Sequence, residues 1–260
     1  MASLNGIWYE AVGEGSSIVL LHGGTGDAAS YWAEQISFFA KEFKVITIDH
    51  RGYGKSEMGR VGNYLETCAD DIALVLDHLR IAKTHVVGLS LGGRVAQCFA
   101  LRHPHKLRRL VLADTLAGMR TEKLRRFIED VLIGTAEKAG MEHVFDLNLL
   151  WAFSETYLRD NKEKLVHQKE KWSGTSAQDF VTVLNATKDL DMTDELSRIA
   201  APTLIIWGSE DIETPRFYSD VLEQAIPNAM LVTIPGSGHK TCVEKPREFN
   251  KIVQTFLRDA

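Results

Sequence analysis

The sequence of 260 residues contains only three cysteines, Cys68, Cys98 and Cys242. An odd and widely spaced set does not make a disulfide framework, and a chain of this length can bury a core without one. We therefore expect free thiols in a reducing compartment, with Cys98 packed against a core. A modifiable thiol is the alternative at Cys242, which lies near a candidate site residue, His239.

Long apolar runs and an excess of basic residues are also missing. No run approaches the roughly 20 apolar residues that cross a bilayer, and we expect no signal peptide in the first residues. The chain has 30 Lys and Arg against 35 Asp and Glu, a formal net charge of -5, so we expect no nucleic-acid footprint. The sequence predicts a soluble, cytoplasmic monomer or homodimer that binds neither nucleic acid nor membrane.

No internal repeat and no linker rich in Gly, Ser or Pro divides the chain. Short apolar runs alternate instead with amphipathic stretches. The runs occupy residues 18–21, 45–48, 85–89, 110–113, 203–207 and 230–234. Such runs suit strands buried on both faces, and the stretches 64–81 and 245–258 have apolar residues at helical spacing. This alternation predicts the α/β class, with a doubly wound, mostly parallel sheet. Residues 7–12 alternate more and predict an outer, antiparallel strand.

Residues 116–197 break this rhythm, because they contain helix-like stretches and no clear strand. An all-helical insertion between two strands is most simply a cap over the carboxyl edge of the sheet, where ligands bind in such folds. We therefore expect a core of residues 1–115 and 198–260 with a helical cap of residues 116–197. Cap aromatics could line a pocket, although packing within the cap is the simpler role. They are Trp151, Phe153, Tyr157, Trp172 and Phe180.

The clearest chemical signal is the segment from Gly88 to Gly92, with Ser90 at its centre. It matches G-x-S-x-G, a strained turn between a strand and a helix that exposes the serine hydroxyl. The apolar run 85–89 precedes it and a helical pattern over 94–101 follows, as that turn requires. Ser90 is therefore the candidate nucleophile.

A nucleophilic serine needs a base, and the base needs an orienting acid. His239 directly follows the predicted strand 230–234, and Asp211 follows the strand 203–207. Both residues then lie at the edge of the sheet that carries Ser90. Their order along the chain is serine, acid, histidine, which is the order found in proteins with the G-x-S-x-G turn. Asp114, at the end of the run 110–113, is the alternative acid. We favour Asp211 because its Gly-x-x-Asp turn before the histidine is the commoner arrangement.

Backbone amides must also stabilise the oxyanion that the serine would generate. The amide of Leu91, at the start of the predicted helix, is one candidate donor. The second is Gly24 or Thr25, in the small-residue loop that begins at His22. We expect the His22 side chain to bind loop atoms rather than take part in chemistry.

Together with the loops His22–Gly24 and Asp49–Ser56, these motifs resemble the α/β-hydrolase family, and they span the chain apart from the helical insertion. Within the family the chain is similar to small capped carboxylesterases and 3-oxoadipate enol-lactonases. The resemblance implies hydrolysis of a small-molecule ester or lactone through an acyl-enzyme, without metal or cofactor.

Other activities remain open at this point. The same triad serves carbon–carbon bond hydrolases, hydroxynitrile lyases and cofactor-free perhydrolases, and some members of the fold are small-molecule receptors. Lys240, directly after His239, either lies in solvent, contacts an anionic substrate or supports lyase chemistry. Arg94, which follows the serine turn, is expected in the core or in a salt bridge.

Overall fold

The computed structural model describes residues 2–59, 62–173 and 175–258, with the side chains of residues 2 and 170–173 excepted. Within these residues eight strands form one sheet in the order β1-β2-β4-β3-β5-β6-β7-β8. The strands are β1 (Ala2–Leu4), β2 (Ile7–Val12), β3 (Ser16–Leu21), β4 (Phe43–Ile48), β5 (Thr84–Leu89), β6 (Leu107–Ala113), β7 (Thr203–Gly208) and β8 (Ala229–Ile234). The described strands pair in parallel from β4 to β8, which confirms the predicted sheet.

The amino-terminal edge departs from the prediction in one detail. Strand β2 is antiparallel to β4, as expected. On its other side β2 pairs with β1, also antiparallel, so β1 and not β2 forms the outer edge of the sheet. Strand β1 has only three residues, which are too few to show an alternating pattern in the sequence.

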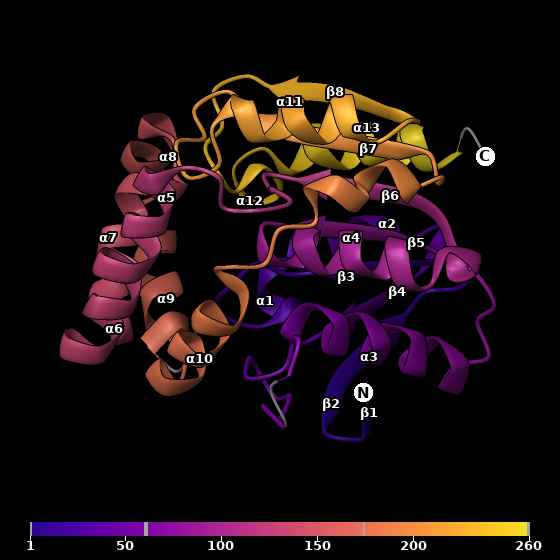
Figure 1. The fold of residues 1–260 in the computed structure, drawn as a ribbon, viewed down its shortest axis with the longest axis horizontal. Helices are drawn as coiled ribbons and strands as arrows, with labels where there is room; N and C mark the ends of the chain where they lie inside the picture. The colour runs from indigo at the N-terminus through magenta and orange to yellow at the C-terminus, as the bar shows by residue number, and fades with distance from the viewer. Residues whose placement is uncertain (1, 60–61, 174, 259–260) are drawn as a thin grey trace.

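Helices cover both faces of the sheet (Figure 1). The helices of the two faces are α1 (Ala28–Tyr31), α2 (Ala33–Phe39), α3 (Tyr64–His78), α4 (Leu91–Arg102), α11 (Arg216–Ala225), α12 (Thr241–Glu244) and α13 (Pro246–Arg258). Alternate residues of a strand point to opposite faces. In β5, for example, Val86 packs in the cluster with α3 and α4, whereas Val87 packs in the cluster with α2 and α13.

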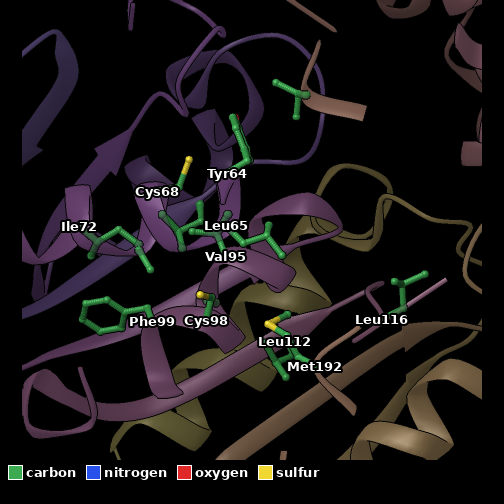
Figure 2. Packing of buried hydrophobic residues seen from close by; sticks show 14 of the residues in the cluster. Tyr64, Leu65, Cys68, Ile72, Val95, Cys98, Phe99, Leu112, Leu116 and Met192 are labelled. Atoms are coloured by element: carbon green, nitrogen blue, oxygen red, sulfur yellow. The ribbon is translucent and has the colours of Figure 1, made fainter. Parts of the chain in front are cut away.

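Figure 2 shows the first of these cores, where Leu65 and Ile72 of α3 meet Val95 and Phe99 of α4. Cys98 is buried in this cluster, as the sequence predicts. This packing anchors α4, and therefore the turn that precedes it, against the sheet.

Between β6 and β7 the chain forms a group of helices that stands apart from the sheet layers (Figure 1). They are α5 (Glu122–Arg126), a π-helical segment (Phe127–Ile133), α6 (Gly134–Ala139), α7 (Met141–Ala152), α8 (Glu155–Asp160), α9 (Lys162–Ser173) and α10 (Ala177–Thr187). Among the described residues, no helix is both long and apolar enough to span a membrane.

Candidate active site

Ser90 lies on the turn between β5 and α4, where the sequence places it. Its φ of 54° and ψ of -118° are strained for a residue with a side chain. A Cβ on Gly88 would lie 2.3 Å from the Gly92 carbonyl oxygen, and one on Gly92 would lie 2.2 Å from that of Leu21. Both glycines are therefore required for so tight a turn.

Asp211 and His239 meet at the same edge of the sheet. His239 Nδ1 donates to Asp211 Oδ2 over 2.9 Å, and both side chains are buried. The other carboxylate oxygen accepts from the amides of Glu213 and Thr214, and the Thr214 hydroxyl donates to Oδ2 over 2.6 Å. These bonds fix the carboxylate, and with it the plane of the imidazole.

The alternative acid, Asp114, has different partners. Its Oδ1 accepts from the amide of Gly208, and its Oδ2 accepts from the amide and the hydroxyl of Thr241. Asp114 thus links the ends of β6 and β7 to α12. The structure pairs His239 with Asp211 by hydrogen bonding, and it gives Asp114 the role of a buried connector.

The candidate oxyanion donors lie around Ser90. Gly24, Thr25 and Leu91 line one cavity together with Ser90 and His239. Leu91 begins α4, a helix of 12 residues, so its amide belongs to the free N–H groups of a helix amino terminus.

His22 has a structural position, as expected. Its Nδ1 donates to the carbonyl of Gly23 over 2.7 Å, and its Nε2 accepts from the amide of His50 over 3.0 Å. Burial lowers the pKa of His22, so the ring is neutral and holds the loop in place.

The cavity above Ser90 has a mostly apolar wall. Side chains from the helical insertion and the segment before it supply much of this wall, and they are Met119, Leu124, Ile128, Leu132, Val144 and Phe180. Of the other aromatics, Phe153 and Tyr157 stack within a separate cluster, and Trp151 stacks on Phe127. Trp172 lies outside the described side chains.

The structure excludes one of the alternatives for Lys240 and places Arg94 in the core, as expected. Lys240 is only 6% exposed, so the first of its three alternatives, a position in solvent, is wrong. Its ammonium lies 4.7 Å from the ring of Phe153. Burial lowers the pKa of Lys240 to about 8. Arg94 is buried, where it donates to the carbonyls of Thr187 and Leu190, and so joins α4 to the end of α10.

Glu213 was missed because no motif marks a residue two positions after Asp211. It lines the cavity, and its Oε1 lies 3.6 Å from His239 Nε2. Burial alone would lower the pKa of His239, but the Asp211 and Glu213 carboxylates raise it to about 10. The thiol of Cys242 is buried and its pKa is raised well above its ordinary value, mainly by desolvation, so it is not poised for modification.

A mostly parallel sheet with helices on both faces, and a serine on a strained turn at the end of a central strand, defines the α/β-hydrolase class of fold. The sequence model of the alpha/beta hydrolase fold family matches residues 17–246. The chain therefore belongs to the alpha/beta hydrolase family, and it is a hydrolase.

Individual relatives share this architecture over nearly the whole chain. A protein of Rhizobium rhizogenes that is named as a carbamate hydrolase, RutD, is 29% identical over 92% of each chain. The enol-lactonase from Burkholderia xenovorans superimposes with a TM-score of 0.89 at 28% identity, over 99% of both chains. A thermophilic esterase from Thermogutta terrifontis superimposes with a TM-score of 0.87 at 26% identity, over 97% of this chain and 93% of its own.

Proposed function

We propose that the chain is a serine hydrolase that cleaves a carboxylic ester or lactone of a small molecule through an acyl-enzyme. The observation that carries this proposal is His239, which lines the same cavity as the strained Ser90 and is hydrogen-bonded to Asp211 behind it. The relatives support the same substrate class, since they include an enol-lactonase and an esterase.

In the proposed reaction Ser90 Oγ attacks the carbonyl carbon while His239 Nε2 takes the hydroxyl proton. Asp211 holds the imidazole and stabilises its charged form. The amide of Leu91 and that of Gly24 or Thr25 bind the oxyanion, each worth about 3 kcal/mol. His239 then returns the proton to the leaving oxygen, and water hydrolyses the acyl-enzyme by the same steps in reverse order.

We propose further that residues 116–197 act as a cap over a core of residues 1–115 and 198–260. Side chains of the insertion line the cavity that contains Ser90. Two contacts join the parts: the buried Arg94 reaches the end of α10, and the half-buried Glu244 carboxylate accepts from the Ser154 hydroxyl. An insertion held in this way would select substrates by the shape of its apolar wall.

A carbamate ester is a second candidate substrate. The Rhizobium rhizogenes relative is named as a carbamate hydrolase and covers 92% of this chain. A carbamate carries a nitrogen on the carbonyl that Ser90 would attack, so the proposed chemistry is unchanged and only the group next to the carbonyl differs.

Replacement of the nucleophile tests the proposal. Ser90→Ala should lower kcat on p-nitrophenyl butyrate by at least about 10⁴-fold, because no other group supplies the attacking oxygen. Ser209→Ala, at an exposed serine on the loop after β7, is the matched control and should keep wild-type activity. Ester hydrolysis that survives in Ser90→Ala would refute the proposed mechanism.

A further inference from the structure

His239 lies between two carboxylates. Asp211 Oδ2 accepts from Nδ1 over 2.9 Å, and Glu213 Oε1 lies 3.6 Å from Nε2 on the other side of the ring. Among the described residues, Nε2 has no hydrogen-bond partner, so the Ser90 hydroxyl is not bonded to it in this structure. The nitrogen that should accept the proton of Ser90 instead faces the second carboxylate.

Glu213 is held in this position by both its backbone and its side chain. Its amide donates to Asp211 Oδ1 over 2.9 Å, and its Oε2 accepts from Asn148 Nδ2 of α7 over 3.4 Å. Its side chain is only 16% exposed. The carboxylate is therefore part of the cavity wall and is not a mobile surface group.

The charged and titratable groups around His239 come from several elements. Asp211 and Glu213 lie on the loop after β7, and Asp114 directly follows β6. Tyr31 lies on α1, and Lys240 is the next residue after His239. Negative charges within a few ångströms stabilise an imidazolium more than a neutral ring, and more strongly where water is excluded. This geometry favours a protonated His239 in the empty cavity.

We propose that Glu213 holds His239 in its protonated form when the cavity is empty, and so sets the lower pH limit of the reaction. The inference rests on the proposed role of His239 as the base. A protonated imidazole cannot take the proton of Ser90, so the enzyme becomes active only as pH rises through the pKa of His239. Glu213 is thus a positioning residue that acts through His239.

The pH dependence of Glu213→Gln tests this inference. Glutamine keeps the shape of the side chain and removes its charge, so the acid limb of kcat/KM for p-nitrophenyl butyrate should move down by at least about one pH unit. At a pH below both limbs kcat/KM should then be at least about tenfold above wild type. Glu210→Gln, which removes the same charge from an exposed position on the same loop, should leave the limb unmoved.

A second measurement does not depend on turnover. The Cε1 proton of His239, assigned by its loss in His239→Gln, is titrated by NMR in the substrate-free protein. The inference predicts a lower midpoint in Glu213→Gln than in wild type, and equal midpoints would overturn it. Activity that persists in Ser90→Ala would refute the proposed hydrolase mechanism, whereas the NMR midpoints would still report the effect of Glu213.

Discussion

Asp114 and Asp211 are buried carboxylates at the ends of neighbouring strands, and their hydrogen bonds differ. Asp211 holds the imidazole of His239, whereas the hydrogen bonds of Asp114 to the part of the chain that the structure describes come from Gly208 and Thr241. Asp211 therefore orients the imidazole of His239, whereas Asp114 holds the loops at the end of the sheet together.

Asparagine at each position should separate these roles. Asp211→Asn should lower kcat by about 10⁴-fold with little change in stability, because the imidazolium loses its charged partner. Asp114→Asn should keep most of the activity and lose about 1–3 kcal/mol of unfolding free energy, because its amide group would face the donors of Thr241. Ester kinetics and urea unfolding measure the two effects. Loss of activity only in Asp114→Asn would contradict the assignment of Asp211.

At the scale of elements, side chains of the helical insertion form much of the apolar wall of the cavity. Leu132, on the π-helical segment, is buried and lines the apolar wall. Leu132→Trp should shorten the space for an acyl chain. If the tryptophan keeps two methylenes of the acyl chain out of the apolar cavity, the loss of burial costs about 1.6 kcal/mol. The kcat/KM for p-nitrophenyl octanoate should then fall about 15-fold, while that for p-nitrophenyl acetate is preserved.

The matched control is Leu150→Trp on α7, since Leu150 is 68% exposed. It should leave the preference for chain length unchanged. Equal losses on acetate and octanoate in Leu132→Trp would show that the acyl chain does not enter this part of the cavity.

The elements of the sheet were predictable because their physical signal is local. The inner parallel strands β3, β4, β5 and β7 are buried on both faces, so each appears as a continuous apolar run. Strand β8 at the edge is only partly buried, but it keeps the same apolar run. Gly88 and Gly92 mark the turn that only glycine permits. The environments of Glu213 and Lys240 were not predictable. They depend on how Phe153 and Asn148 of the insertion pack against the loops after β7 and β8, and no spacing in the sequence records that packing.

At the scale of the whole molecule, Lys240 should make stability depend on pH. The unfolded chain keeps this lysine protonated up to its ordinary pKa of 10.5, whereas the folded protein releases the proton near pH 8. Between these values the unfolded state binds more protons, so this contribution to stability rises with pH. The expected gain is on the order of 3 kcal/mol between pH 7 and pH 10.5.

Lys240→Met isolates this contribution, because methionine fills a similar volume without a charge. Urea unfolding at several pH values should show a smaller rise in stability with pH for the variant than for wild type. If the unfolding free energy changes with pH by the same amount in both proteins, the lowered pKa of the buried Lys240 is contradicted.

The most direct test of the whole account is covalent labelling of the nucleophile. After incubation with a fluorophosphonate, intact-mass spectrometry should show a single adduct, and peptide mapping should place it on Ser90. The adduct should be absent in Ser90→Ala and should form far more slowly in His239→Gln. An adduct on another residue, or equal labelling of Ser90→Ala, would contradict the account.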